Sequence, residues 1–380
     1  MRPVSLVLCG TLLTFTSCVQ IPRVAMPQRH TPIKRPTLEL AVAIPREIEA
    51  HAQRAVIVAP PKPKEKVEAV IVVALDGVRW QEIFEGTGEL HERDARVPVQ
   101  DPEQLVPNLS RWATEQGSSV GAPGFGAMRA TGPDYLSLPG YTEIMTGRPP
   151  KDCQSNFCGA VKIPTMLDQA KEAYPDEHVA VVSSWERIAY AASPTLEGID
   201  FSSGRMRANG VPDLWLREAR RYPSWPGEGE YRADAFTMPV ALNVLKKERP
   251  KLMFIGLGDT DEHAHHGDIP SYVGALRTAD AFLGRLEDTL ADMGERGHHT
   301  AIFVTCDHGR NADFREHGGE WPESGRVWLV ATGAGIAVEG KVDTHDVHLA
   351  DLAPTVRELL DLPTDEDESA GKPMDAILER

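Results

Sequence analysis

Acidic and histidine side chains follow several apolar runs of the sequence at the points where those runs end. Three runs end in this way, and the residues that follow them are Asp76, Asp259, Asp307 and His308. A single aspartate in such a place is typical of a turn or a helix cap. In an α/β sheet, however, ligands bind beyond the carboxyl ends of the strands. Three such ends together therefore predict a metal site built from carboxylate and imidazole ligands.

Ser137 is the candidate nucleophile. Pro139 follows it closely and Gly147 lies further on, a pair of signals that predicts a short helix between them. Ser137 would then lie at a helix N-terminus, where free N–H groups and the helix dipole favour a phosphate oxygen and a developing alkoxide. Alone, this serine would be interpreted as an N-cap residue. Beside metal ligands, it is better interpreted as a nucleophile whose alkoxide a divalent ion stabilises.

The elements that must position these residues alternate along the chain from residue 67 onward. Short Val- and Ile-rich runs without polar alternation indicate strands buried on both faces. We expect a single α/β domain with a doubly wound, mostly parallel sheet flanked by helices. The expected strands cover residues 69–75, 178–182, 252–257, 301–305 and 327–331, and the expected helices cover residues 105–116, 139–146, 163–172, 233–247, 271–293 and 349–360.

The N-terminal region predicts export. Residues 1–18 combine a basic residue, a short apolar run and Cys18, as a signal peptide does. The last four of these residues resemble a lipoprotein box, so a lipid anchor on Cys18 and a simply cleaved signal both stay open. We expect residues 19–66 to be a Pro-rich tether, residues 67–363 to be the catalytic domain and residues 364–380 to be a polar C-terminal tail. The expected location is the periplasm or cell envelope.

The charge and the cysteine content of the chain bear on which kinds of ligand and which disulfide to expect. The chain has 40 Lys and Arg against 56 Asp and Glu, a net charge of -16, which disfavours a nucleic-acid-binding surface. An acidic protein that binds an anion needs local positive charge, and bound divalent ions would supply it. Export makes a disulfide between Cys153 and Cys158 reasonable. Cys306 follows an apolar run and is expected to be a buried, inert thiol.

The order of the motifs resembles the alkaline phosphatase superfamily, in particular its type I phosphodiesterase and nucleotide pyrophosphatase branch. The resemblance covers about residues 67 to 362, most of the mature chain. The motifs are Ala74-Leu75-Asp76-Gly77, Ser137-Leu138-Pro139 through Thr146-Gly147, Asp259-Thr260-Asp261-Glu262-His263, Asp307-His308-Gly309 and His317-Gly318. Each motif alone is weak, but the ordered set is specific.

This resemblance implies two divalent metal ions. One set of ligands would be Asp76, Ser137, Asp307 and His308, and the other would be Asp259, His263 and His317. A nitrogen and oxygen ligand set without thiolate suits Zn²⁺ and leaves Mn²⁺ open. His345 and His348 are alternatives to His317. The remaining charged residues near the third motif are interpreted as mostly surface residues, and they are Asp261, Glu262, His265, His266 and Asp268.

The resemblance also implies an exported phosphoric ester hydrolase, either a phosphatase or a phosphodiesterase, that acts on a small-molecule ester through a phosphoserine at Ser137. Relatives place an asparagine near the position of Asn156, where it donates to a phosphoryl oxygen. A turn role for Asn156 is equally open. Arg148 and Arg310 could contact the anion, but an arginine beside a motif is usually exposed.

Two alternatives stay open. A sulfate or phosphonate ester hydrolase of the same superfamily is one, because the metal framework tolerates related anions. Gly140-Tyr141 stands where the diesterase branch has Asn-His, and Tyr141 occupies the place of the arginine that formylglycine sulfatases need. A non-catalytic lipoprotein binding module is the other. The segment 184–232 is expected to form part of the pocket wall, and its tryptophan and tyrosine residues are Trp185, Tyr190, Trp215, Tyr222, Trp225 and Tyr231.

Overall fold

An eight-stranded, mostly parallel sheet forms the centre of the structure, a computed structural model in which residues 66–380 except residues 207 and 212 are described. Across the sheet, the strands are β10 (Gly340–Lys341), β2 (Gly117–Val120), β9 (Leu329–Gly333), β7 (Thr300–Thr305), β1 (Ala69–Leu75), β6 (Leu252–Leu257), β4 (Val179–Ser183) and β5 (Asp200–Ser203). Only β9 runs antiparallel to its neighbours β7 and β2 in this sheet. The predicted signal peptide and tether lie outside the described residues, apart from Lys66.

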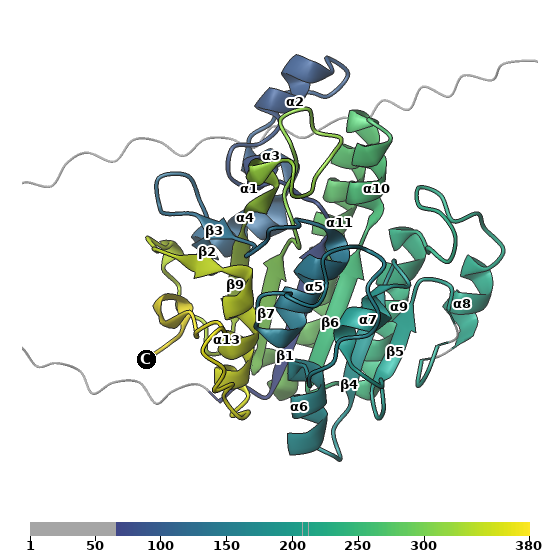
Figure 1. Cartoon of the computed structure of the whole chain (residues 1–380), viewed down its shortest axis with the longest axis vertical. Helices are drawn as coiled ribbons and strands as arrows, with labels where there is room; N and C mark the ends of the chain where they lie inside the picture. The colour runs from purple at the N-terminus through teal and green to yellow at the C-terminus, as the bar shows by residue number, and fades with distance from the viewer. Residues whose placement is uncertain (1–65, 207, 212) are drawn as a thin grey trace, which may run out of the picture. The chain divides into compact units, whose positions relative to one another are not determined.

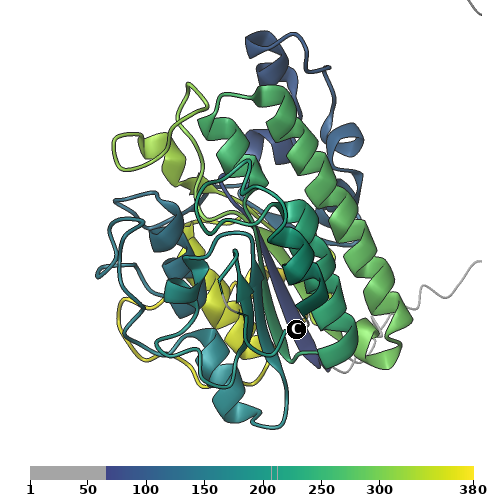
Figure 2. The same cartoon turned by 90° about the vertical axis from the view of Figure 1, so that its right-hand side faces the viewer.

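Helices cover both faces of this sheet (Figures 1 and 2). One face carries α4 (Pro107–Thr114), α9 (Asp234–Glu248) and α11 (Ile269–Asp292), and the other carries α5 (Ser137–Thr146), α6 (Met166–Ala173), α7 (Ile188–Ala192) and α13 (Leu352–Leu359). The central strands β1, β6 and β7 are buried along their whole length because they are covered on both sides. The predicted doubly wound α/β fold is confirmed.

Shorter elements complete the part of the chain that the structure describes. The helices are α1 (Trp80–Phe84), α2 (Gly88–Arg93), α3 (Pro102–Leu105), α8 (Asp213–Ala219), α10 (Asp259–His265) and α12 (Glu295–His298), the 3-10 helices are η1 (Pro322–Gly325), η2 (Leu349–Asp351) and η3 (Asp375–Ile377), and a second small sheet contains β3 (Met128–Arg129), β8 (Arg326–Val327) and β11 (Val347–His348). Residues 364–380, predicted as a polar tail, pack on the domain through the buried Met374, Ile377 and Leu378.

The order of the strands positions the site. Strands β7, β1 and β6 are neighbours at the centre of the sheet, and β1 pairs in parallel with both of the others. Their carboxyl ends therefore meet at one edge, where polar residues follow each of them. Asp76 follows β1, Asp307 and His308 follow β7 after one residue, and α10 begins after β6. Polar residues from segments far apart in the sequence thus lie together at one edge of the sheet.

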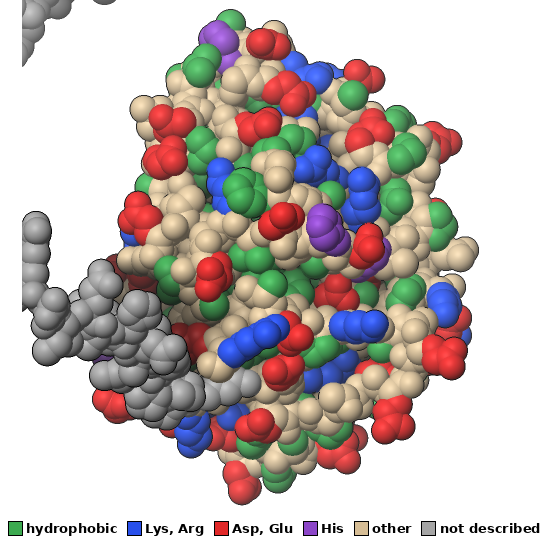
Figure 3. Space-filling model, turned by 90° about the vertical axis from the view of Figure 1, so that its left-hand side faces the viewer, with side chains coloured by type: hydrophobic (Ala, Val, Ile, Leu, Met, Phe, Trp, Pro, Cys, Tyr) green, Lys and Arg blue, Asp and Glu red, His purple; other side chains and the backbone are tan. Residues whose placement is uncertain are grey.

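Two features of the surface bear on partners. The face drawn in Figure 3 carries acidic and basic side chains side by side, rather than a continuous basic stripe of the kind that follows a nucleic-acid backbone. Among the described residues, no helix is both long and apolar enough to cross a bilayer.

Glu143 connects helix α5 to the loop at Thr131 and to the 3-10 helix η2. It is buried, and its carboxylate accepts hydrogen bonds from the backbone N–H and hydroxyl of Thr131 and from the backbone N–H of Ala350. Burial raises its pKa from 4.5 to about 7 in spite of these donors. The folded state therefore binds one proton more than the unfolded state across this range of pH.

We expect this proton to make stability depend on pH. Because the folded-state pKa is the higher one, the free energy of unfolding should fall as pH rises from 4.5 to about 7 and then level off. Between pH 4.5 and about 7 this one group should lower the free energy of unfolding by up to about 3 kcal/mol. Glu143→Gln cannot ionise at this position and should not show that fall. The measurement is Tm against pH for the two proteins. Glu115→Gln, a change at an exposed site, is the control, and an identical slope in Glu143→Gln would contradict the expectation.

Candidate metal centre

Four buried side chains converge at the carboxyl ends of β1 and β7. His308 Nε2 lies 3.4 Å from Asp76 Oδ1 and 3.4 Å from Asp307 Oδ2. Ser137 Oγ lies 3.3 Å from the same nitrogen. The structure thus brings together the four residues that the sequence assigned to one ion.

The carboxylate oxygens that face this point have no other partner. Asp76 Oδ1 and Asp307 Oδ2 are buried without a hydrogen bond. The second oxygen of Asp76 accepts from the Tyr141 hydroxyl at 2.9 Å, and the second oxygen of Asp307 accepts from the Gly77 N–H at 3.1 Å. Burial raises the pKa of Asp76, and it raises that of Asp307 to about 8. Two such carboxylates need a cation between them to be ionised together near neutral pH.

His308 supplies a lone pair to the same point. Its Nδ1 lies 2.9 Å from the Gly309 carbonyl oxygen. A carbonyl can only accept, so Nδ1 carries the proton and Nε2 presents its lone pair. Burial and then the neighbouring His317 hold the pKa of His308 well below its usual range, which keeps the ring neutral. Carboxylate and imidazole lone pairs therefore converge as a divalent cation requires.

A second group lies beside the first. His265 Nε2 is 3.0 Å from His317 Nε2 and 3.2 Å from Asp261 Oδ2. His317 donates from Nδ1 to the Tyr135 carbonyl at 2.8 Å, so its Nε2 lone pair also faces inward. The stacked rings of His308 and His317, with centroids 3.7 Å apart, join the two groups. Together the groups offer nitrogen and oxygen ligands for two ions.

The structure does not place Asp259 and His263 in either group. Asp259 Oδ1 accepts from the Tyr231 hydroxyl at 2.7 Å and from the Asp234 N–H at 3.1 Å. The His263 ring packs 6.2 Å from that of Trp225. A helix turns by about 100° per residue, so pairs shifted by two residues face opposite sides of it. The predicted spacing of an aspartate and a histidine four residues apart is present, but the pair that faces His317 is Asp261 and His265, which lie two residues after Asp259 and His263.

Two of the surface interpretations were wrong. Asp261 is 7% exposed and Arg310 is 3% exposed, and the Arg310 guanidinium contacts the Asp261 carboxylate and the Gly77 carbonyl. Burial opposes the ionisation of Asp261, but Arg310 holds its pKa well below the usual range. A Cβ on Gly77 would come within 2.5 Å of Asp261 Oδ1. Only glycine therefore fits at this point between the two groups.

The other candidates lie elsewhere. His345 and His348, the alternatives to His317, line a separate pocket. Arg148 forms ion pairs with Asp365 and Asp367 of the C-terminal segment. Cys306 is a buried free thiol whose pKa burial raises, as expected for an inert residue.

Helix α5 brings Ser137 to the first group. It begins at Ser137 and ends at Thr146, and Gly147 follows as a cap in the left-handed conformation, so the predicted helix is confirmed. A Cβ on Gly140 would lie 2.4 Å from the Asp307 carbonyl oxygen, so glycine allows the helix to approach that strand end. Tyr141, in the next position, orients Asp76. In the sequence, these two residues are recognisable only as departures from a motif.

The start of α5 offers an anion fewer donors than the sequence predicted. The Leu138 N–H donates to Asn156 Oδ1 at 2.9 Å, Pro139 has no N–H, and the Gly140 N–H donates to the Leu136 carbonyl at 2.9 Å. Most of the free N–H groups that could hold a phosphate at this helix end are therefore in use.

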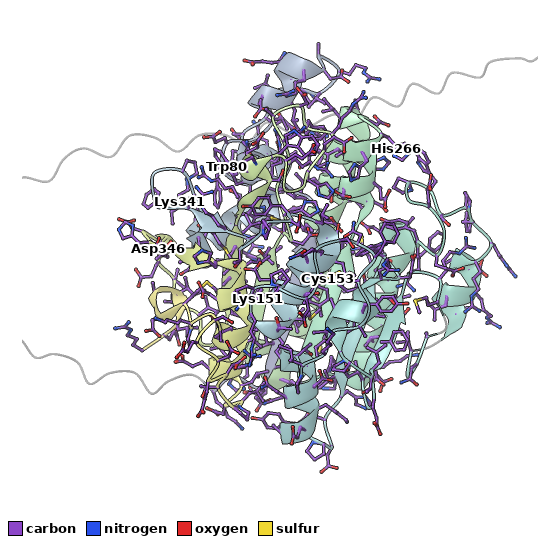
Figure 4. The ribbon with its side chains drawn as sticks, in the orientation of Figure 1. Trp80, Lys151, Cys153, His266, Lys341 and Asp346 are labelled. Atoms are coloured by element: carbon purple, nitrogen blue, oxygen red, sulfur yellow. A yellow bond between two sulfur atoms is a disulfide. The ribbon has the colours of Figure 1, made fainter. Side chains whose placement is uncertain are left out.

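The side-chain amide of Asn156 can act as a donor to an anion instead of these backbone N–H groups. Cys153 and Cys158 form the expected disulfide, and Figure 4 shows Cys153 beside α5. Since the Leu138 N–H can only donate, the atom that faces it is the Asn156 carbonyl oxygen. The Nδ2 group then remains as a donor, and Asn156 lines the cavity beside Ser137.

This cavity has a volume of about 130 Å³ and is lined by Asp76, Ser137, Asn156, Trp185, Tyr231, Gly258, Asp261, Glu262 and His265. Pockets for drug-sized ligands are typically about 300 Å³ or more, so this one suits a small head group. Trp185 and Tyr231 confirm that the segment 184–232 contributes to the wall. In that segment, Tyr222 and Trp225 are exposed, Tyr190 packs on Arg187, and the Trp215 side chain lies outside the described part.

Part of this chain is similar to known proteins. A family model described as the Metalloenzyme superfamily matches residues 231–364. The 2,3-bisphosphoglycerate-independent phosphoglycerate mutases of Rippkaea orientalis and Trichodesmium erythraeum are 30% identical over 136 residues and 33% identical over 138 residues. Each alignment covers 33% of this chain and 24% of the mutase. The chain thus spans about a quarter of the length of these curated relatives.

Solved structures share the fold across most of the chain. Alkaline phosphatase PafA matches with a TM-score of 0.56 at 12% identity, covering 83% of this chain and 100% of its own. The phosphonate monoester hydrolase of Silicibacter pomeroyi matches with a TM-score of 0.56 at 14% identity, covering 82% and 76%. A 2-O GAG sulfatase matches with a TM-score of 0.56 at 12% identity, covering 82% and 74%. The fold is alkaline phosphatase-like, and the three neighbours carry different activities.

Proposed function

We propose that this chain, a member of the metalloenzyme superfamily with an alkaline phosphatase-like fold, hydrolyses phosphoric esters through Ser137 with two divalent metal ions, and that it prefers diesters. The observation that carries the proposal is the convergence of unpartnered, buried ligand atoms on Ser137 Oγ. A binding module would have no use for a serine hydroxyl at that point.

The proposed metal ligands are the side chains that lie together in the two groups described above. Asp76, Asp307, His308 and Ser137 hold one ion, and Asp261, His265 and His317 hold the other. These nitrogen and oxygen donors favour Zn²⁺, with Mn²⁺ as the alternative. When bound, the ions supply positive charge that favours the serine alkoxide and the charge that develops on the ester oxygens.

The residues of the chain then perform two displacements. Ser137 Oγ loses its proton to solvent and attacks phosphorus, an oxygen–phosphorus bond forms, and the leaving ester oxygen departs with the electron pair of the phosphorus–oxygen bond that breaks and takes up a proton from solvent where it is basic enough. Asn156 Nδ2 donates to a non-bridging oxygen. Water next attacks the phosphorus of the modified serine, the bond between Ser137 Oγ and phosphorus breaks, one proton of the water goes to Ser137 Oγ and the other to solvent, and the phosphate monoester leaves. Tyr141 keeps Asp76 in its orientation throughout because its hydroxyl is bonded to that carboxylate.

The charge of the cavity favours diesters. Among the described residues that line it, none is Lys or Arg, and Glu262 adds a carboxylate. A phosphate monoester carries a second negative charge that this wall does not compensate, whereas a diester carries one. A sulfate ester also carries one charge, so a sulfatase remains the second candidate.

The test compares p-nitrophenyl phosphate, bis-p-nitrophenyl phosphate and p-nitrophenyl sulfate. We expect the highest kcat/KM for the diester, loss of turnover on chelation and recovery when Zn²⁺ is returned. A preference for the sulfate would support the sulfatase instead. No turnover of any ester with two ions bound would support a binding module.

Asn156 offers a sharper test of the mechanism. Asn156→Asp keeps an oxygen to accept from the Leu138 N–H but removes the Nδ2 donor, and Asn156→Ala removes both. If the amide stabilises the transition state, both variants should lose about 10²-fold in kcat, as a missing oxyanion donor does. Steady-state kinetics on the diester provides the measurement. Near-normal kcat in Asn156→Asp would show that Asn156 only shapes the turn.

We also propose that the enzyme is exported. The composition of residues 1–18 supports this, as does the disulfide in the catalytic domain. Cell fractionation of the wild type and of Cys18→Ser tests both parts: loss of membrane association in the variant alone supports a lipid anchor, and wild-type protein in the cytoplasm would refute export.

A further inference from the structure

A second and larger cavity lies beside the segment 309–312, which follows His308 in the chain. Its volume is about 470 Å³, within the usual range of sites for small organic ligands. It shares no lining residue with the cavity at the metal centre. Arginines predominate among its charged lining residues, which are Arg79, Glu89, Arg129, Arg310, Glu323 and Arg326.

Two of these arginines already have acidic partners. The Arg79 guanidinium lies 2.6 Å from a carboxylate oxygen of Glu82 and 3.1 Å from one of Glu89. The Arg310 guanidinium contacts the carboxylate of Asp261. The charges of both arginines are therefore balanced within the protein, and so is that of Glu89. The other two arginines of the lining are in a different position.

Arg129 and Arg326 lie directly opposite each other, because β3 and β8 pair antiparallel in that register. Like charges in such positions repel each other. Within the described part of the chain, neither arginine forms an ion pair with a carboxylate. Burial and then Arg129 lower the pKa of Arg326, and Glu85 opposes this only through its charge. Two like charges are thus held together without a counter-charge in a protein whose net charge is -16.

Arg326 is held in place and keeps a free donor. Its guanidinium carbon lies 4.0 Å from the centroid of the Trp80 ring, a residue of α1 that Figure 4 labels. Its Nη2 reaches the Gly121 carbonyl oxygen at 3.4 Å, and its Nε is buried without a hydrogen-bond partner. A buried charged donor without a partner costs free energy that an anionic ligand would offset.

The remaining polar groups of the lining do not supply that partner. Glu323 is exposed, and its Oε1 accepts from the Ala312 N–H at 3.2 Å. Gln81 is neutral, and its Oε1 is also buried without a partner. An amide can accept from a hydroxyl or donate to an oxygen of a ligand. Gln81 therefore adds a second group in this cavity whose hydrogen bonding a ligand would complete.

We propose that this cavity is a second ligand site, which binds an organic phosphate monoester as a dianion with its phosphoryl oxygens on Arg129 and Arg326. Two guanidinium groups carry the charge that neutralises a dianion, and their planar donors match the oxygens of a phosphate. The volume of about 470 Å³ leaves room for an organic substituent beside the phosphoryl group. This site is separate from the metal centre and does not depend on the proposed hydrolysis of esters.

The experiment counts bound ligands by equilibrium dialysis of the metal-loaded full chain against phenylphosphonate. At a pH where it is fully ionised, this probe is a dianion, and it has no ester bond to hydrolyse. The wild type should bind two molecules per chain, one at the metal centre and one in this cavity. Arg129→Gln and Arg326→Gln should each weaken binding in the cavity about tenfold or more, as loss of a charged hydrogen bond does. At a concentration that fills both sites of the wild type, these variants should then bind nearer to one molecule.

The control is Arg285→Gln, which removes the same charge from an exposed position on α11 and should bind as the wild type does. Because Arg129 is exposed, Arg129→Gln should fold even if Arg326→Gln does not, and circular dichroism checks both. Benzenesulfonate, a monoanion of similar shape, should bind in the cavity more weakly than phenylphosphonate.

The outcomes separate this inference from the proposed function. One bound molecule in the wild type that is lost in the arginine variants would support the cavity site and count against an anion site at the metal centre. One molecule that is retained in those variants would overturn the inference and leave the metal centre standing. No binding at all, or equal binding of benzenesulfonate and phenylphosphonate in the cavity, would also overturn the inference.

Discussion

Replacing Ser137 with alanine should lower kcat for bis-p-nitrophenyl phosphate by about 10³-fold or more, as loss of a nucleophile does. Ser137 Oγ is the group at the convergence of Asp76, Asp307 and His308 that can form a covalent bond to phosphorus. Those three ligands remain in the variant, so both metal ions should stay bound. Steady-state kinetics together with metal analysis provides the measurement.

The matched control is Thr142→Ala on the same helix. Its hydroxyl donates to the Leu138 carbonyl, one turn from Ser137 and outside the ligand groups. This variant should keep near-normal turnover. If Ser137→Ala retained more than about a tenth of the wild-type kcat, water rather than serine would be the attacking group.

Asp261→Asn should remove one metal ion per chain and lower kcat by about 10²-fold or more, because a bound ion contributes several kcal/mol of transition-state stabilisation. Asp259→Asn is the matched control, because it makes the same isosteric change two residues earlier on the same helix. The asparagine oxygen can still accept from Tyr231 and from the Asp234 N–H. Both ions should therefore remain in Asp259→Asn.

Metal content per chain and kcat, measured on folded samples, distinguish these two positions. Asp261 also pairs with Arg310, so circular dichroism must first show that Asp261→Asn is folded. If Asp259→Asn lost an ion while Asp261→Asn kept both, the ligand register first inferred from the sequence would be right and the structural one wrong.

The sequence predicted the fold well because its central strands are apolar along their whole length. The runs 69–75 and 252–257 appear with the predicted bounds as β1 and β6, and 301–305 appears within β7. Because ligands bind at the carboxyl ends of such strands, the polar residues after them were found as well. The structure accordingly places Asp76, Asp307, His308 and Ser137 together.

Other features left no clear pattern in the sequence. Strand β2, Gly117–Val120, consists mostly of small and polar residues, so it lacks the apolar signal of its neighbours. The pairs Asp259 with His263 and Asp261 with His265 have identical spacing, and only the orientation of α10 decides which pair faces His317. That orientation depends on packing against other elements, which spacing within one helix does not encode.

Arg310 and Tyr141 were missed for a similar reason. A buried arginine is unusual, and Arg310 is buried because Asp261 and the carbonyls of Gly77, Phe314 and Arg315 satisfy its donors. Two of these partners, Gly77 and Asp261, lie far from Arg310 in the sequence. Tyr141 is recognisable as an orienting residue only when its hydroxyl is seen on Asp76.

The most direct test of the central claim is to trap the covalent intermediate. The enzyme is mixed with a diester, quenched in acid within one turnover and digested with trypsin, and the peptide 130–151 that contains Ser137 is analysed by mass spectrometry. We predict a gain on Ser137 in the wild type equal to the phosphoryl group with the ester substituent that did not leave, and this gain should be absent after chelation and in Ser137→Ala. Rapid product formation with Ser137 unmodified at every quench time would contradict a serine nucleophile.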